Sequence, residues 1–302
     1  MCEAIDVNLL FRWFLDLQPS DDAFDATSFG KNRPRLDEHH LTKAFFDAVV
    51  AEALTANLCS EHFSVDGTLI ESLASAKSFQ PTDAKDDEPQ DTNGFKPRNA
   101  EVDFHGQKRT NATHRSTTDP EAKLYRKSKG QEAKLTHMGH VLNENRNGLI
   151  LAVTATEASG TAERGATLTM LDDLQATHGR QPRTLGADKG FDDGEFFQHL
   201  EMRQIEPHIP LVKEPRDPKT VPNKNQVPGV EARQRMQRRM QTEGYRLSQK
   251  CRKKVEECFG WLKTIAGLDR CRTVGRWKLQ QALELGAAAF NLVRLRKLAP
   301  AP

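Results

Sequence analysis

Apolar and polar residues alternate with a period of two in several short segments in the middle of the chain. Residues 62–73 read HFSVDGTLIESL, in which apolar and polar side chains take turns. This period predicts a β-strand. Two further strand-like runs, 134–144 and 148–158, are joined through Asn147-Gly148. Because Asn-Gly favours the tight turns of hairpins, these two runs are expected to pair with each other.

A spacing of three to four between apolar residues indicates helices elsewhere. Near the N-terminus it occurs in 8–17 and 41–54, with a capped turn expected between them at 25–36. A helix is expected to end at Gly179, and a long helical region is expected at 231–266. The remaining predicted segments are the helices 192–204 and 276–298 and the short strands 183–188 and 205–212.

The order of these elements predicts a mixed α/β protein with a small helical N-terminal region. That region is expected at 1–60 and the main domain at 61–302. The stretch 80–122 is so poor in apolar residues that it is expected to be flexible, and the Pro-rich stretch 213–230 is expected to be a loop.

Charge is distributed unevenly along the chain. The whole protein has a net charge of +2, yet from Glu231 to the end there are 17 Lys and Arg against 6 Asp and Glu. Such a basic block favours a polyanionic partner over a plain solvated surface. The five cysteines form no CxxC pair, which argues against a disulfide framework and a zinc knuckle. No apolar run is long enough for a membrane span, and no glycine-rich phosphate loop indicates a nucleotide cofactor.

Two aspartates lie at predicted strands. Asp66 is inside the strand 62–73, where an ionised carboxylate is costly unless a cation or another partner compensates it. Asp188 follows the strand in RTLGADKGF, at the end where α/β sheets present functional groups. A lone aspartate in either place is more often structural than functional. A third carboxylate brought beside them would favour a metal site.

The segment KKVEECFGWLK supplies two adjacent glutamates on a predicted helix. At 100° per residue, Arg252, Glu256 and Lys263 share a stripe beside the apolar face that packs on the sheet. Glu257 points further round, toward solvent. Glu256 is therefore the candidate third acid. The plainer alternative is an ion pair between Arg252 and Glu256, worth only ~0.3–0.5 kcal/mol.

The chain resembles the DDE transposases of bacterial insertion sequences in the segments VDGTLIE, ADKGF and RKKVEECFGWLK. Arg252, Glu256 and Lys263 fall at the spacing of that family's Tyr-Arg-Glu-Lys signature, whose tyrosine position is Gln249 here. The resemblance implies an RNase H-like catalytic domain, a mixed sheet flanked by helices. It also implies DNA cleavage followed by strand transfer at the ends of an insertion sequence.

This family's chemistry implies that Asp66, Asp188 and Glu256 are both the catalytic residues and the metal ligands. Two Mg²⁺ ions, or Mn²⁺ in their place, would neutralise the transition state, activate the attacking oxygen and stabilise the leaving oxygen. Three carboxylates match the oxygen preference of such ions. In this interpretation Asp66 bridges the two ions, while Asp188 and Glu256 each complete one.

The expected partner is double-stranded DNA, both the terminal inverted repeats and the target, bound by a homodimer or a larger assembly in the bacterial cytoplasm at the nucleoid. Residues expected to contact DNA are Arg252, Lys263, Lys253, Lys254, Arg238, Arg239 and Lys189. Trp261 and Trp277 are expected to pack rather than to stack on bases.

Two alternatives stay open at this stage: a catalytically inactive DNA-binding remnant, and a nuclease of the same fold without strand transfer. The N-terminal segments resemble only the tail of the helical domain that precedes the catalytic domain in relatives. The DNA-recognition region is therefore expected to be shortened.

Overall fold

The computed structural model divides into two compact units. It describes residues 2–82, 102–104, 107–126 and 130–298. The units are residues 1–45 and 46–302, so the division falls inside helix α4 (Leu41–Thr55) rather than at residue 60. The cause is burial, because Phe46, Val50 and Ala53 of α4 belong to the core of the larger unit.

The smaller unit contains helices α1 (Cys2–Val7), α2 (Leu9–Phe14) and α3 (Ala26–Glu38). Arg12 is almost fully buried, and its guanidinium donates hydrogen bonds to the carbonyls of Asp6, Gln18 and Asp21. The turn predicted at 25–36 is wrong, since α3 occupies most of it. A side-chain oxygen of Asp25 accepts a bond from Thr27 N at 2.7 Å and supplies the helix start.

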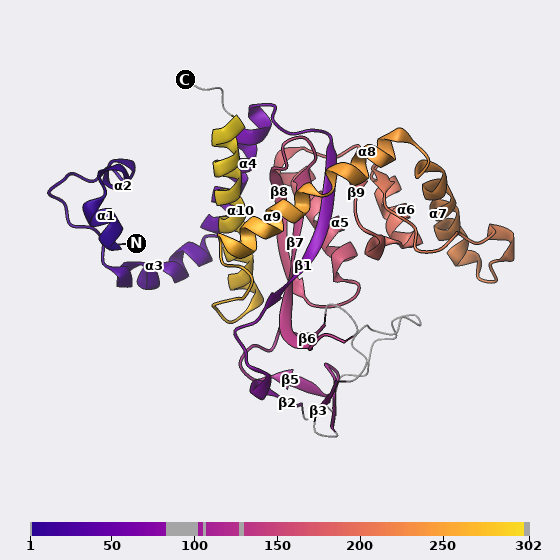
Figure 1. The fold of residues 1–302 in the computed structure, drawn as a ribbon, viewed down its shortest axis with the longest axis horizontal. Helices are drawn as coiled ribbons and strands as arrows, with labels where there is room; N and C mark the ends of the chain where they lie inside the picture. The colour runs from indigo at the N-terminus through magenta and orange to yellow at the C-terminus, as the bar shows by residue number, and fades with distance from the viewer. Residues whose placement is uncertain (1, 83–101, 105–106, 127–129, 299–302) are drawn as a thin grey trace. The chain divides into compact units, whose positions relative to one another are not determined.

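A six-stranded mixed sheet forms the centre of the larger unit (Figure 1). β7 runs antiparallel to both of its neighbours β8 and β1, whereas β1, β9 and β10 are parallel to one another. A short strand, β6, extends the edge of β7 beyond β8. The strands are β1 (His62–Glu71), β6 (Lys123–Tyr125), β7 (Lys134–Glu144), β8 (Ile150–Glu157), β9 (Thr184–Gly186) and β10 (Glu206–His208).

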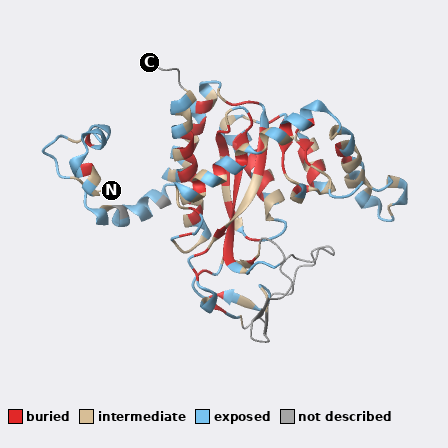
Figure 2. Cartoon of the chain, viewed as in Figure 1, coloured by how far each residue is buried: buried red, intermediate tan, exposed pale blue. Residues whose placement is uncertain are grey.

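The predicted α/β class is confirmed, and the local signals explain why. The hairpin predicted at Asn147-Gly148 joins β7 to β8, with Gly148 at φ 71°. Helix α5 (Ala162–His178) ends at Gly179, whose φ of 61° is the left-handed conformation that glycine adopts without strain. Figure 2 shows buried residues concentrated along the central strands and the helix faces turned toward them.

Helices cover both faces of the sheet. Further along the chain come α6 (Gly194–Met202), α7 (Val227–Arg239), α8 (Glu243–Cys251), α9 (Lys254–Thr264) and α10 (Arg276–Leu298). Consecutive residues of β1 show the two sides, because Asp66 meets Arg252 beside α9 whereas Gly67 faces Glu163 of α5. None of the helices in the described ranges is both long enough and apolar enough to cross a bilayer.

The helical region predicted at 231–266 is present but is divided among three helices, α7, α8 and α9. Thr242 starts α8 by accepting a bond from Tyr245 N, which separates α8 from α7. Between α8 and α9 the backbone hydrogen bonds join residues that are three apart instead of four, such as the 3.1 Å bond from Glu256 N to Lys253 O. The loop predicted from 213 ends earlier than residue 230, since α7 starts at Val227 with a proline in its first turn.

Side-chain amides of α10 protect the outer edge of β8. Asn291 accepts from Ile150 N at 2.9 Å and donates to Ile150 O at 2.7 Å. Gln280 makes the equivalent pair with Ala155 N and Val153 O. The two amides thus take the place of a neighbouring strand along an edge that would otherwise have unpaired backbone groups.

A buried carboxylate organises the hairpin between β7 and β8. Glu144 is fully buried and accepts backbone N–H bonds from Ser60, Arg146, Asn147 and Leu149. Four donors satisfy the charge that burial would otherwise make costly. This residue fixes the start of β1 to the turn.

The polar stretch 80–122, predicted to be flexible, lies partly outside the described residues. Its described part begins at β2 (Phe79–Pro81) and includes β3 (Val102–Phe104), β4 (Gln107–Arg109) and β5 (His114–Ser116). Asp119 is fully buried there, bound by Ser72 Oγ at 2.7 Å and His137 Nε2 at 2.9 Å. These polar bonds, which composition does not reveal, hold residues 114–122 against the sheet.

Candidate active site

The parallel pairing of β1 with β9 brings two aspartates to one place. Ser64 of β1 lies opposite Gly186 of β9. Asp66 lies two residues after Ser64, and Asp188 lies two residues after Gly186. Asp188 is therefore just beyond the end of β9, next to the part of β1 that carries Asp66. The side chain of Asp188 is fixed, because its Oδ1 accepts a bond from Gly190 N at 2.7 Å.

The two adjacent glutamates of α9 have different surroundings. Glu256 and Glu257 both lie in the first turn of α9, which contacts β1 and β7. Glu257 is 60% exposed, and its Oε2 lies 3.3 Å from Nη1 of Arg294 on α10. The prediction that Glu257 belongs to the surface charge pattern is confirmed. Glu256 lies on the flank toward Asp66, whose pKa its charge affects.

Asp66 is the electrostatic centre of this cluster. Its Oδ2 lies 3.4 Å from Nη1 of Arg252, and both side chains are only about a fifth exposed, at 22% and 20%. Burial, together with the charges of Asp188 and Glu256, raises the pKa of Asp66 to about 6, while the Gly67 N–H and Arg252 act in the opposite direction. Asp188 and Glu256 therefore lie within electrostatic range of Asp66. The ion pair of Arg252 joins it to Asp66, not to Glu256 as the plainer alternative supposed.

Gln249 connects α8 to the strand ends that carry the site. Its Nε2 donates to His208 O at 2.5 Å and to Ala187 O at 3.4 Å. Ala187 directly precedes Asp188, so the amide holds the backbone on which that carboxylate is mounted. Sequence reasoning noted Gln249 only as a departure from a tyrosine. The signal available was its position one helical turn before Arg252.

Gly67, which sequence reasoning also missed, lets β1 approach α5 closely behind Asp66. A Cβ at Gly67 would lie 2.7 Å from Oε1 of Glu163 and 3.1 Å from Nδ1 of His140. A side chain there would require Glu163 and His140 to move, next to the residue that carries the Asp66 carboxylate. The signal in the sequence was a glycine inside an otherwise regular strand.

The predicted DNA-contacting residues have different surroundings. Lys189, Lys253 and Arg238 are exposed. Lys263 donates to Leu69 O of β1 at 3.1 Å, so its ammonium lies along the strand that carries Asp66. Arg252 is the partner of Asp66, as described above.

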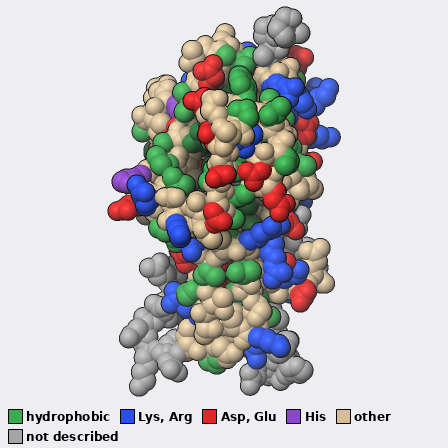
Figure 3. All heavy atoms as spheres, turned by 90° about the vertical axis from the view of Figure 1, so that its left-hand side faces the viewer, with side chains coloured by type: hydrophobic (Ala, Val, Ile, Leu, Met, Phe, Trp, Pro, Cys, Tyr) green, Lys and Arg blue, Asp and Glu red, His purple; other side chains and the backbone are tan. Residues whose placement is uncertain are grey.

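Two of the predicted contacts have internal partners instead. Lys254 donates to the carbonyls of Asn145 and Arg146 in the hairpin turn, the former at 2.8 Å. Arg239 lies 2.9 Å from Glu201 Oε1 and 3.2 Å from Glu206 Oε1. In the structure both cations therefore contact other residues of the same chain and stabilise its fold. The face of the molecule drawn in Figure 3 has side chains of both charges among apolar ones, not one continuous basic surface.

Comparison with known proteins identifies the family. The family described as Transposase DDE domain matches residues 58–292. The chain belongs to this family. It is thus a transposase, an enzyme of nucleotidyl transfer. A solved structure described as a Mos1 transposase paired-end complex with left transposon end is similar at 10% identity over 93% of this chain and 73% of that chain, with a TM-score of 0.25. So low a score carries no argument. No curated protein matches the chain.

DDE transposases use divalent metal ions, and the donor chemistry of this cluster fits such an ion. Asp66, Asp188 and Glu256 offer the carboxylate oxygens that Mg²⁺ and Mn²⁺ prefer. Burial, and after it the charges of Asp188 and Glu256, raise the pKa of Asp66, and a bound cation would favour its ionised form. As the described side chains stand, no group of three His, Cys, Asp or Glu is arranged to hold an ion. The positive group beside Asp66 in the structure is Arg252.

Proposed function

We propose that this transposase cuts the phosphodiester backbone at the ends of an insertion sequence and joins the freed 3′ ends to target DNA. Asp66, Asp188 and Glu256 are the proposed catalytic acids. The observation that carries the proposal is the parallel register of β1 and β9, which brings Asp66 and Asp188 to the same end of neighbouring strands. Burial, and after it the charges of Asp188 and Glu256, raise the pKa of Asp66, so the three acids lie within electrostatic range of one another. Such mutual repulsion is costly in an ordinary fold and useful where a cation binds.

The three acids would hold two divalent ions, Mg²⁺ or Mn²⁺. Bound ions of this kind neutralise charge at a scissile phosphate and activate the attacking oxygen. The chain's own residues position the acids: the β1 to β9 register sets Asp66 near Asp188, the first turn of α9 presents Glu256, and the Gln249 amide holds the end of β9.

Arg252 would bind the DNA phosphate next to the scissile bond. Its guanidinium forms two parallel bonds to a phosphate as readily as to a carboxylate. In the structure this guanidinium lies 3.4 Å from Asp66, so it would stand beside a phosphate held at the acids. Lys263, on the same side of α9, adds a point charge further along β1. Both residues therefore act on the substrate's negative charge.

Exposed cations would hold the flanking DNA without reading its sequence. Lys189, Lys253 and Arg238 suit this function because they are exposed. For Lys254 and Arg239 we propose the internal function instead. Because a transposase acts on the ends of its element, we propose double-stranded terminal repeats and target DNA as the partners, with two or more copies of the chain assembled on them.

The two glutamates of α9 provide the test. Labelled DNA that contains the element's ends is incubated with the full chain and Mg²⁺ or Mn²⁺, and both cut and joined products are measured. Glu256→Gln should abolish cutting and leave DNA affinity unchanged. Glu257→Gln, the matched control one residue away on the exposed flank, should cut at close to the normal rate. Equal loss in both variants would refute the assignment.

Two further variants extend the test to the sheet. Asp66→Asn and Asp188→Asn should behave as Glu256→Gln does, because each removes one of the proposed ligands. Cut products without joined products would reduce the proposal to a nuclease. DNA binding without any cutting by the unaltered chain would reduce it to an inactive remnant.

A further inference from the structure

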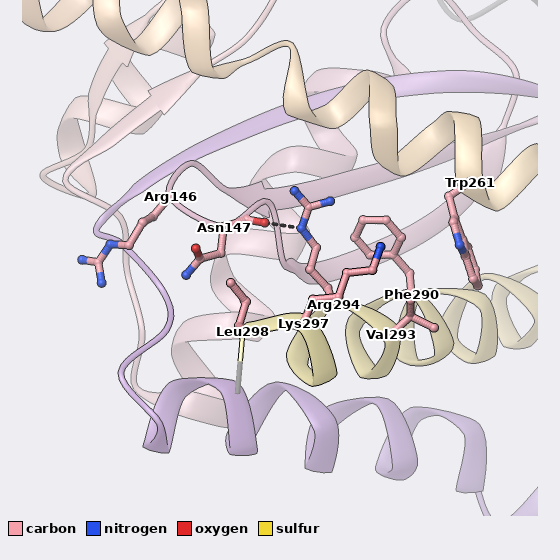
Figure 4. A pocket seen from close by; sticks show the side chains of 8 residues that line it. All are labelled: Arg146, Asn147, Trp261, Phe290, Val293, Arg294, Lys297 and Leu298. Atoms are coloured by element: carbon pink, nitrogen blue, oxygen red, sulfur yellow. Dashed lines mark hydrogen bonds between the residues drawn. The ribbon is translucent and has the colours of Figure 1, made fainter. Parts of the chain in front are cut away.

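A pocket of about 390 Å³ lies between α9, α10 and the turn that joins β7 to β8 (Figure 4). Glu257 of α9 lies near it, 3.3 Å from the lining residue Arg294. Its walls come from three elements that are distant in sequence. Trp261 belongs to α9, Phe290 and Arg294 belong to α10, and Arg146 belongs to the turn between β7 and β8. The volume lies in the range of pockets that hold small organic ligands.

One wall of the pocket is aromatic. The rings of Trp261 and Phe290 meet edge to face, with centroids 5.6 Å apart and planes at 72°. Phe290 is buried, whereas Trp261 is only partly buried, and both side chains line the pocket. A flat aromatic ligand would stack there at little cost, because the wall is already assembled.

The rim of the pocket is positively charged. Arg146 and Lys297 are exposed at its edge, and Arg294 lies between them. The guanidinium carbon of Arg294 is 5.5 Å from the centre of the Phe290 ring. An acidic residue, Glu257, lies next to this rim, with its Oε2 3.3 Å from Nη1 of Arg294. The rim therefore suits a ligand with one or more negative groups next to a flat ring.

Internal contacts hold the pocket in shape. Arg294 Nε donates to Asn147 O, which ties α10 to the hairpin turn. Gly148 makes this approach possible, because a Cβ at that position would lie 3.2 Å from Nη2 of Arg294. Lys254 fixes the same turn from α9. The two helices and the turn thus form one preassembled site.

We propose that this pocket binds an unpaired nucleotide of the DNA strand, with the base on the Trp261 wall and its phosphate at Lys297 and Arg146. The inference rests on the proposed function, since one helix presents Glu256 on one flank and this pocket on the other. A helix is about 10 Å across, so a strand at Glu256 needs only a few nucleotides to reach the pocket. A paired base has its faces covered by its neighbours and cannot use the aromatic wall, so the site selects single-stranded DNA.

Fluorescence anisotropy with the full chain in EDTA, which prevents cutting, tests the proposal. One labelled DNA is a blunt duplex, and the other is the same duplex with a four-nucleotide unpaired tail. The unaltered chain should bind the tailed DNA more tightly. Trp261→Leu should lower affinity for the tailed DNA roughly ten-fold and change affinity for the blunt duplex less than two-fold. Lys297→Gln should weaken the tailed complex several-fold and make it less sensitive to salt.

The chain contains a matched control pair away from the pocket. Trp277 and Lys278 also form a cation and ring contact, with Nζ 5.3 Å from the ring centre, and Trp277 is 50% exposed. Trp277→Leu and Lys278→Gln should leave the preference for the tailed DNA unchanged. Equal losses in the control variants, or equal losses on both DNAs with Trp261→Leu, would overturn the pocket's assignment. So would an unaltered chain that shows no preference for the tail.

The outcome for the pocket can be separated from that for the active site. Glu256→Gln should cut nothing yet keep the full preference for the tailed DNA. If the unaltered chain cuts DNA but lacks that preference, the pocket proposal fails and the proposed function stands. If the chain binds neither DNA, the proposed function fails, and the pocket proposal fails with it.

Discussion

Replacing Asp66 by Asn should change the stability of the metal-free protein in a way that depends on pH. Burial, with the charges of Asp188 and Glu256, raises the pKa of Asp66 from 3.8 to about 6, against the Gly67 N–H and Arg252. Between these two values the native protein binds more protons than the unfolded chain does. Its stability therefore falls as the pH rises through this window, and Asn at the same position has no such dependence.

The size of the effect follows from the shift. At about 1.4 kcal/mol per pKa unit, an ionised Asp66 costs the native state about 3 kcal/mol at pH 8. At pH 4.5 the cost is about 1 kcal/mol, because the side chain is then mostly protonated in the native state. The stability of Asp66→Asn relative to the unaltered chain should rise by about 2 kcal/mol between these pH values. This increase does not depend on how well Asn packs against Arg252.

Thermal and urea unfolding in EDTA at pH 4.5 and pH 8 measure this increase, which should appear as roughly 4 °C in melting temperature. Glu257→Gln is the control, because its carboxylate is exposed, and its difference from the unaltered chain should stay within about 0.5 kcal/mol at both pH values. An Asp66→Asn difference that is the same at pH 4.5 and pH 8 would refute the reasoning. Adding Mg²⁺ at pH 8 should stabilise the unaltered chain and not the variant.

Four further substitutions test contacts within the larger unit. Glu144→Ala should cost about 3 kcal/mol or more in urea unfolding, because it leaves four backbone N–H groups, those of Ser60 and Leu149 buried, without their acceptor. A loss under about 1 kcal/mol would contradict the contacts described. Gly194→Ala should lower the free energy of unfolding by about 1–3 kcal/mol, because its Cβ would lie 2.5 Å from Gly229 O. Gly165→Ala on α5, where a Cβ meets no atom within 4 Å, should raise it by about 0.5–1 kcal/mol. Gln249→Leu should lower kcat for DNA cutting about ten-fold or more with KM nearly unchanged, because it removes the hydrogen bonds that hold the end of β9. A change in KM alone would contradict the proposal that Gln249 positions Asp188.

The sequence by itself determined the elements whose signals are local. The alternation in 62–71, the Asn147-Gly148 turn and the stop at Gly179 predicted β1, a hairpin and the end of α5, and each is present. These signals are reliable because steric preferences and side-chain periodicity act over a few residues. The acids Asp66, Asp188 and Glu256 were also named from local pattern together with family resemblance.

Only the tertiary structure decided what depends on residues far apart in the chain. The break of 231–266 into α7, α8 and α9, the buried Asp119 in a polar stretch, and the internal partners of Lys254 and Arg239 were not predictable from composition. A charged side chain is equally compatible with solvent, DNA or a buried partner. Which of these it meets depends on where the sheet register and helix packing place it, and that information is not contained in any short segment.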